Sequence, residues 1–318
     1  MSTKSAALPA SALRPRAGSD RGIRGFLNRY SHWVLLSPFL ICFTLFILLP
    51  VLCAILLSFT KFDSVQAPVF VGLQNYQDIF TKDTQFMQNV LPNTITYALI
   101  VGPGGYVLSF VLAWLLAQLT PMPRTILAIV IYSPSLLGAT SMATIWGVLF
   151  SGDRMGYLNS VLLSFGLIKE PVSWLTSTEH LLPIMIFIAL WSSMGVGFLA
   201  MLSGIINVDT ELYEAAYIDG VRNRLQEIYY ITIPSVKPQM LFGAVMALVS
   251  TFNSPGLGVT LSGTNPTPGY AGQLIVNHMD DYGFLRYEMG YAAALSVLLL
   301  ILVWLSSRLA YRLFGEKN

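Results

Sequence analysis

The largest group of ionisable side chains in the C-terminal half of the sequence lies between about residues 205 and 235, between two apolar runs. Glu211 and Glu214 stand three residues apart, which places them one turn apart on a helix. A carboxylate on an exposed helix can form a charge-assisted hydrogen bond with a basic side chain of another protein. An ordinary amphipathic linker would carry the same charges facing solvent. The residue types therefore indicate either recognition of a basic group or plain solvation.

Two short helices are predicted in this stretch. Asp209 can cap the first, because its carboxylate can accept from the free N–H groups of the first turn. Gly220 can end it, since glycine adopts the left-handed conformation without steric cost. A second helix is expected from about Arg222 to Tyr230, until Pro234 prevents its continuation. The sequence therefore predicts two short helices with a glycine bend between them, outside the lipid.

The elements that must hold this stretch are membrane helices. Of the 318 residues, 54% are hydrophobic and 11% are charged, and the mean hydropathy is +0.63. A soluble domain carries about 25% charged residues, so we expect an all-α polytopic membrane protein. Crossing the hydrocarbon core takes about 20 helical residues. Six stretches are long enough, at about 34–59, 94–118, 125–150, 181–204, 238–261 and 289–313.

The Lys and Arg residues predict how these helices are oriented. With the N-terminus inside, thirteen fall on the cytoplasmic side and five on the external side. The positive-inside rule therefore places both termini and the polar stretch in the cytoplasm. The expected parts are a basic tail (1–32), a first helix (33–60), an external loop (61–92) and a main membrane domain (90–313) with a cytoplasmic loop at 205–235.

Two of the predicted helices contain breaks. The run Gly102-Pro103-Gly104-Gly105 interrupts the second and Ser133-Pro134-Ser135 the third. Such breaks are tolerated in lipid only where neighbouring helices or water satisfy the freed backbone groups. They suit helices that line a pathway, and they also occur in plain bundles.

No catalytic pattern is found in the sequence. It lacks the phosphate-binding Gly-x-x-x-x-Gly-Lys-Ser/Thr loop, so the chain is not expected to hydrolyse ATP. It shows no Ser/His/Asp arrangement and no paired metal ligands, so neither an enzyme nor a metal site is expected. No predicted helix interior holds an unambiguous charge, which argues against a proton-coupled carrier. The charged residues between 280 and 288 are expected to form a solvated loop.

Candidate solute-contacting side chains lie inside the predicted helices. Neutral sugars are bound by aromatic faces and by hydroxyl and amide groups around the ring. Small polar residues also join membrane helices to one another, so the same side chains fit a structural role. The candidates are Tyr132, Trp191, Ser192, Ser193 and Asn253.

The polar stretch resembles the "EAA…G…I-x-LP" cytoplasmic loop of permease subunits from binding-protein-dependent ABC importers. The matching residues are Glu214-Ala215-Ala216, Asp219-Gly220 and Ile231-Thr232-Ile233-Pro234. Asp209 stands where proline is frequent and Val221 where alanine is frequent. Ten residues separate Gly220 from Ile231, one more than is usual in the family.

The rest of the chain resembles the sugar-transporting branch of this family. The runs Gly72–Tyr76, Gly156–Asn159 and Pro171–Leu175 are similar to its external loops, which receive a substrate-binding protein, although their aromatic residues would also suit membrane-interface anchors. The stretch Thr260–Pro268 loosely resembles the branch's "LTGGGP…T" motif. The likeness covers about residue 34 to the C-terminus.

The resemblance implies the fold and the partners. We expect the type I ABC importer permease fold, with five shared helices, an extra first helix, and a coupling helix between helices 4 and 5 that docks on an ATPase. The expected coupling residues are Glu211, Glu214, Ala215, Ala216, Asp219, Gly220, Ile231 and Pro234.

The expected assembly lies in the bacterial cytoplasmic membrane. It contains a second related permease, two ATPase subunits that hold ATP and Mg²⁺, and an external binding protein that delivers a carbohydrate. No cofactor in this chain and no nucleic acid are expected. The alternatives are an ABC permease for glycerol phosphate or another small solute, and a self-sufficient secondary carrier. The carrier would need an intramembrane ion site, and none is visible in the sequence.

Overall fold

The structure is a computed structural model that describes residues 23–252 and 256–314. The chain divides into two units, residues 1–53 and 54–318, each described by itself. The first unit contains α1 (Ile23–Phe43), a π-helical turn η1 (Thr44–Leu48) and the start of α2 (Leu49–Leu57). Its apolar side chains, such as Leu35 and Phe46, are exposed within the unit. Residues Leu35–Leu57 are long and apolar enough to cross a membrane, where the sequence predicts a helix at 34–59.

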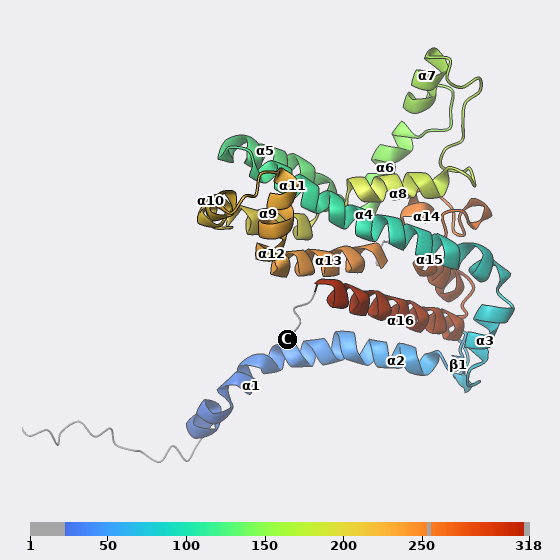
Figure 1. The fold of residues 1–318 in the computed structure, drawn as a ribbon. Helices are drawn as coiled ribbons and strands as arrows, with labels where there is room; N and C mark the ends of the chain where they lie inside the picture. Colours follow the sequence, from blue (N-terminus) through green and yellow to red (C-terminus); the bar gives the residue numbers. More distant parts are fainter. Residues whose placement is uncertain (1–22, 253–255, 315–318) are drawn as a thin grey trace, which may run out of the picture. The chain divides into compact units, whose positions relative to one another are not determined.

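The second unit is mostly helical (Figure 1). Two short strands, β1 (Thr60–Lys61) and β2 (Val69–Phe70), form an antiparallel pair. The helices that follow are α3 (Gln74–Thr81), η2 (Phe86–Val90), α4 (Leu91–Ala117), α5 (Pro121–Tyr132), η3 (Ser133–Leu136), α6 (Ala139–Leu149), α7 (Tyr157–Ser164), α8 (Leu181–Trp191) and α9 (Val196–Ile206). They continue with α10 (Thr210–Ile218), α11 (Arg224–Glu227), η4 (Ile228–Thr232), α12 (Ile233–Ser235), α13 (Lys237–Phe252), α14 (Leu257–Ser262), η5 (Pro268–Tyr270), α15 (Ile275–Asp280), η6 (Asp281–Leu285) and α16 (Met289–Phe314).

The described residues contain four helices that could each cross a membrane alone. Besides Leu35–Leu57 these are Phe86–Ala117, Leu181–Ile206 and Met289–Arg308, close to the predicted first, second, fourth and sixth helices. The number rises to six if each of two bent helix pairs is one span. In the predicted third helix the chain turns by 102° between Pro121–Leu136 and Thr140–Leu149, directly after the η3 turn that contains Ser133-Pro134-Ser135.

The predicted fifth helix, 238–261, is not one continuous element. Helix α13 ends at Phe252, residues 253–255 lie outside the described part, and α14 begins at Leu257. By contrast, α4 continues straight through Gly102-Pro103-Gly104-Gly105. The glycines there leave room for a neighbour, because a Cβ on Gly105 would lie 2.9 Å from the Cβ of Ser193. The prediction that this run interrupts the helix is therefore wrong. The run instead allows close contact between α4 and Ser193, in the connection after α8.

Helices α4, α9 and α13 form the centre of the bundle and contact one another pairwise, and α13 also packs against α16 (Figure 1). Helices α9 and α13 approach closely at two glycines. A Cβ on Gly197 would lie 3.0 Å from the Cα of Gly243. Small residues permit such close backbone approach between membrane helices. The side chains beside this contact include Phe198, Met201 and Met240, all buried.

A buried polar cluster joins the segment before α4 to the start of α16. The Asp83 carboxylate accepts hydrogen bonds from His278 Nε2 at 2.7 Å, from the Tyr291 hydroxyl at 2.7 Å and from the Phe86 N–H at 2.9 Å. Beside it, Arg286 donates to Asp281 at 2.6 Å and lies over the Tyr282 ring. The prediction of a solvated loop over residues 280–288 is therefore wrong for Asp281, which is buried because Arg286 neutralises it.

The hydrogen bonds to Asp83 determine its protonation. Burial raises the pKa of its carboxyl, but the bonds from His278, Phe86 and Tyr291 outweigh burial and lower that pKa from 3.8 to about 2. Because the folded-state pKa lies below the unfolded value, Asp83 contributes stability that is fully present above about pH 4. That contribution is lost as the pH falls toward 2.

We expect Asp83→Asn to lower the thermal unfolding midpoint in detergent at pH 7 by about 5 °C, because losing charge-assisted hydrogen bonds at a buried site costs about 2 kcal/mol. Asp78→Asn is the matched control, since Asp78 pairs with Lys82, whose side chain is 68% exposed, and exposed pairs contribute little. Equal shifts in the two variants would contradict a special role for the buried cluster.

Candidate functional site

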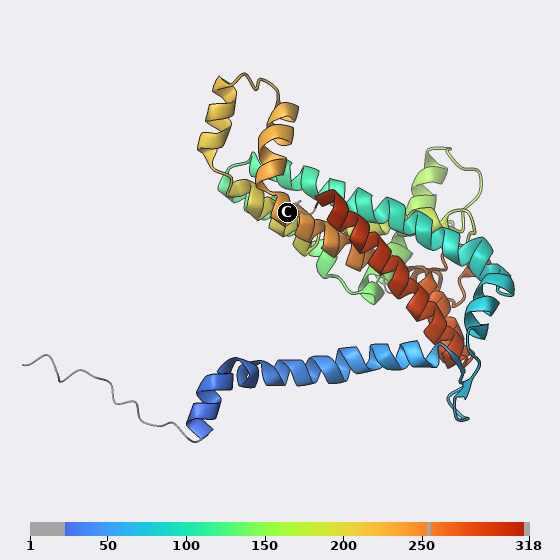
Figure 2. The same cartoon turned by 60° about the horizontal axis from the view of Figure 1, so that its bottom comes forward.

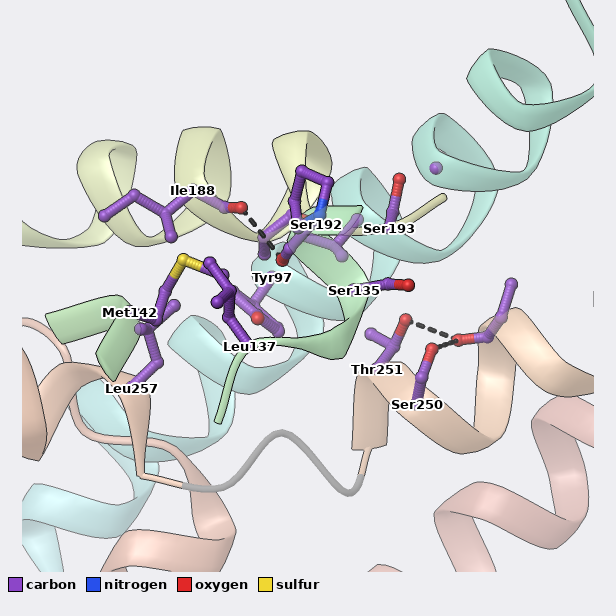
Figure 3. A pocket seen from close by; sticks show the side chains of 15 residues that line it. Tyr97, Ser135, Leu137, Met142, Ile188, Ser192, Ser193, Ser250, Thr251 and Leu257 are labelled. Atoms are coloured by element: carbon purple, nitrogen blue, oxygen red, sulfur yellow. Dashed lines mark hydrogen bonds between the residues drawn. The ribbon is translucent and has the colours of Figure 1, made fainter. Parts of the chain in front are cut away.

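The bundle contains an open cavity of about 260 Å³ where several helices are broken (Figure 3). It lies between α4, the η3–α6 segment, the end of α8 and the end of α13. A second cavity of about 300 Å³ adjoins it, toward α9. The residues that line both cavities are Ser135, Ser192, Ser193, Ala247 and Ser250. Hydroxyl side chains are therefore the dominant polar groups of this site.

The helix breaks explain where these hydroxyls come from. Helix α8 ends at Trp191 and α9 begins at Val196, so Ser192 and Ser193 lie in the connection. Ser135 lies in η3, between α5 and α6. Ser250 lies in the last turn of α13. Serine suits such positions because its side chain can satisfy a backbone carbonyl that a broken helix leaves free.

The hydroxyls donate to their own backbone. Ser192 Oγ donates to the Ile188 carbonyl at 3.0 Å and Ser193 Oγ to the Leu190 carbonyl at 2.7 Å. Ser250 and Thr251 both donate to the Ala247 carbonyl, at 2.9 and 2.7 Å, as Figure 3 shows. A hydroxyl has one hydrogen and two lone pairs. Its oxygen therefore remains an acceptor, and the cavity wall suits a solute that brings many O–H donors.

The part of the cavity wall that the structure describes is uncharged. Among the described residues that line either cavity, none is Lys, Arg, His, Asp or Glu. The remaining wall is apolar or aromatic, including Tyr97, Leu137, Met142 and Leu257 in the first cavity. An isolated ion would lose its hydration here without gaining a counter-charge. The site therefore favours a neutral, polyhydroxylated solute over an ionic one.

The structure brings together some of the predicted pathway residues. Ser192 and Ser193 line both cavities, and Tyr132 lines the second. Trp191 is not among the lining residues; its ring packs edge-on against Trp146, with centroids 5.2 Å apart. Asn253 lies outside the described residues. Sequence reasoning missed Gly105 and Met142, which also line the first cavity. Gly105 packs closely on Ser193, and the Gly-Pro-Gly-Gly run is the sequence signal of this contact.

The polar stretch forms two short helices, as the sequence predicts, and Figure 2 shows them projecting from one end of the bundle. Asp209 caps α10 by accepting from the Glu211 N–H at 3.1 Å. Gly220 follows α10 with a φ of +96°, where a side chain would be strained. Helix α11 starts two residues later than predicted, because Asn223 caps it by accepting from the Leu225 N–H at 2.9 Å.

The second helix continues past the predicted end at Tyr230. After α11 the chain makes the π-helical turn η4, in which the Ile233 N–H bonds to the Ile228 carbonyl, and then enters α12. Pro234 lies in the first turn of α12, where its missing N–H is not needed. A π-helical turn holds one more residue than an α-helical turn. The turn spans Ile228–Thr232 and so includes the end of the ten-residue segment between Gly220 and Ile231.

Most of the predicted coupling residues are at the surface. Glu211, Glu214, Ala215, Asp219, Gly220 and Pro234 are exposed, Ala216 is half-buried and Ile231 is buried. No ion pair involves Glu211 or Glu214 within the described residues. The same two helices expose Leu212, Ile218 and Leu225 to solvent. Exposed apolar side chains beside unpaired carboxylates are typical of a surface that another protein covers.

Sequence comparison decides the family. No family model matches the chain. Its sequence is 30% identical over 297 residues to the probable ABC transporter permease protein YesP of Bacillus subtilis, with 90% of each chain covered. The chain is an ABC transporter permease. The permease is also 27% identical to the arabinooligosaccharides transport system permease protein AraP of B. subtilis, with 95% of each chain covered. Against the lactose transport system permease protein LacF of Rhizobium radiobacter it is 26% identical, covering 93% of the permease and 98% of LacF.

Two solved structures share the fold of the permease. One is a bacterial ABC transporter involved in the import of the acidic polysaccharide alginate, with a TM-score of 0.73 and 23% identity over 91% of the permease and 98% of that chain. The other is a bacterial alginate ABC transporter in complex with an alginate pentasaccharide-bound periplasmic protein, with a TM-score of 0.76 and 21% identity over 93% and 99%. The permease is thus a mostly helical membrane protein that shares its fold with ABC importer permeases.

Proposed function

We propose that this permease imports a neutral oligosaccharide. The observation that carries the proposal is the uncharged, hydroxyl-lined pair of cavities between α4, α8 and α13. Relatives named for arabinooligosaccharide and lactose transport support the carbohydrate class. The alginate transporter named among the solved structures handles an acidic polysaccharide. The absence of charge among the described lining residues separates this permease from such a cargo.

The proposed assembly has four kinds of partner. A second, related permease completes the pathway, and a pair of ATPase subunits supplies the energy and holds ATP and Mg²⁺. An external binding protein delivers the cargo, as the complex between an alginate transporter and a periplasmic protein supports. The assembly lies in the bacterial cytoplasmic membrane with both termini of this chain in the cytoplasm, as the Lys and Arg distribution favours.

The coupling role belongs to α10 and its flanking residues. Closure of the ATPase dimer would move the exposed face around Glu214, and the two permeases would swing so that the cavities open alternately to either side. This chain would perform no covalent chemistry. Glycerol phosphate or another anionic solute fits less well, because no described residue lining either cavity could neutralise it. A secondary carrier would not explain why α10 exposes apolar side chains beside unpaired carboxylates.

Uptake by reconstituted vesicles tests the proposal. The assembly co-purified from its native membrane is placed in liposomes containing ATP, with the binding protein outside and radiolabelled arabinotriose, lactose, glycerol 3-phosphate or a uronic-acid trisaccharide as cargo. We expect ATP-dependent accumulation of a neutral saccharide and none of the two anions. Accumulation of an anion would contradict the proposal that the cargo is neutral. Uptake by the purified chain alone, without ATP, would contradict the proposal that the permease works within an ATP-driven importer.

One substitution connects uptake to the cavities. We expect Ser250→Phe to reduce saccharide uptake more than tenfold, because Ser250 lines both cavities and an aromatic ring would fill their shared space (on the order of 100 Å³ of added side chain). Ser250→Ala is the comparison variant, because it removes one hydroxyl acceptor without filling the shared space and should reduce uptake far less. Equal uptake in the two variants would place the pathway elsewhere.

A further inference from the structure

One hydrogen bond connects α10 to the turn that leads into α13. The Tyr213 hydroxyl of α10 lies 3.2 Å from Thr232 Oγ1, and Thr232 Oγ1 lies 3.4 Å from the Glu227 carbonyl. Because Thr232 has a single hydroxyl hydrogen, its bond to Glu227 makes Tyr213 the donor to Thr232. Thr232 is completely buried. The connection is therefore directional, and its Thr232 end is buried.

The π-helical turn creates the position that Thr232 occupies. Widening the turn η4 to i→i+5 bonding takes one carbonyl out of the regular α-helical pattern. The Thr232 side chain reaches back across this turn to the Glu227 carbonyl and leaves its lone pairs facing Tyr213. The turn thus places the Thr232 hydroxyl within hydrogen-bonding distance of Tyr213 in α10.

Helix α10 has few other attachments. Among the helices and strands, η4 makes the most contacts with α10, while α12 contacts both η4 and α13. The chain turns by 83° between Arg224–Ser235 and Lys237–Phe252. Helix α13 then carries Ala247, Ser250 and Thr251 to the cavity wall. A continuous series of contacts therefore runs from the exposed face of α10 to the proposed cargo site.

We propose that Tyr213 and Thr232 are positioning residues that fix α10 to the start of α13, so that a movement of α10 is passed to the cavity wall. The inference rests on the proposed function, because it requires an ATPase partner that moves α10. Along the chain, α10 is joined to α11 through the bend at Gly220, whose N–H bonds to the Tyr217 carbonyl within α10. The Tyr213–Thr232 hydrogen bond adds a direct side-chain connection from α10 to η4, beside this covalent path.

The test compares Tyr213→Phe and Thr232→Val in the whole assembly, with two measurements. The first is saccharide taken up per ATP hydrolysed in proteoliposomes, using arabinotriose. The second is the distribution of distances between spin labels at Thr210→Cys and Val249→Cys, in chains whose Cys42 and Cys53 are replaced by alanine, with and without ATP. Tyr229→Phe is the matched control, because it removes an exposed hydroxyl from the same turn.

We expect both variants to hydrolyse ATP, to take up about fivefold less saccharide per ATP, and to show a broader label distance than the unsubstituted chain, since one hydrogen bond contributes about 1 kcal/mol. The double variant should be no worse than either single one. Thr232→Ser keeps the hydroxyl and should restore uptake, which a general packing defect would not allow.

An unchanged uptake per ATP together with an unchanged label distance in both variants would overturn the inference. So would an equal loss in Tyr229→Phe. If the unsubstituted assembly takes up no arabinotriose, the choice of cargo fails, and the label distances, which need only nucleotide, still decide the role of Tyr213 and Thr232.

Discussion

Glu214→Lys is expected to abolish saccharide uptake and to weaken association with the ATPase about 100-fold. Glu214 is exposed on α10 and forms no ion pair within the described residues. In the proposed assembly its carboxylate faces a basic group of the ATPase, and placing two like charges together at an interface costs several kcal/mol. Glu214→Gln removes the charge without reversing it and should retain part of the uptake.

The measurement pairs uptake in proteoliposomes with the amount of ATPase that co-purifies. Glu170→Lys is the control, since it makes the same charge change at another exposed position, in the connection between α7 and α8. Both variants should enter the membrane at normal levels. Normal uptake by Glu214→Lys would show that α10 does not bind the ATPase through this residue.

Gly197→Leu is expected to have the largest effect on stability. A Cβ at this position would lie 3.0 Å from the Cα and 3.4 Å from the carbonyl oxygen of Gly243, so a leucine side chain would push α9 and α13 apart. Overpacking of this kind costs about 3 kcal/mol, which lowers the thermal unfolding midpoint by about 8 °C. Because α9 borders the second cavity and leads to α10, uptake should fall as well.

Gly147→Leu is the matched control for this substitution. It adds the same side chain to another helix, α6, at a position where nothing lies within 4 Å of the new Cβ. A thermal scan of both variants in the same detergent measures the difference. A midpoint that falls equally in both would mean that the loss comes from the leucine itself and not from separating α9 and α13.

Local signals in the sequence predicted the polar stretch well. The Asp209 cap and the bend at Gly220 are confirmed, because a cap and a left-handed glycine depend only on residues within one turn. The continuation past Pro234 was not predicted, since proline is excluded from a helix interior but accepted in a first turn. Features that depend on the residues of one turn, such as a cap, could be predicted. The restart of the helix in α12 could not, because it depends on the π-helical turn before it.

Long-range contacts could not be predicted. Asp83 and His278 lie 195 residues apart, and nothing near either residue signals their pairing. The same holds for the 102° turn after η3, since Ser133-Pro134-Ser135 indicates a break and not its angle. In the loop between α6 and α8, Asn159 accepts from the Trp174 Nε1–H at 2.9 Å. The two motifs that contain these residues, both predicted to be external, are therefore parts of one folded loop.

The uncharged wall of the cavities has a consequence for the energetics of transport. Moving one elementary charge through a potential of 100 mV changes the free energy by about 2.3 kcal/mol. A neutral saccharide carries no charge through that field, and the described side chains along its proposed path carry none either. The membrane voltage then neither drives nor opposes the cargo. A cell whose voltage has collapsed would accumulate the saccharide as steeply as an energised one, as long as its ATP lasts.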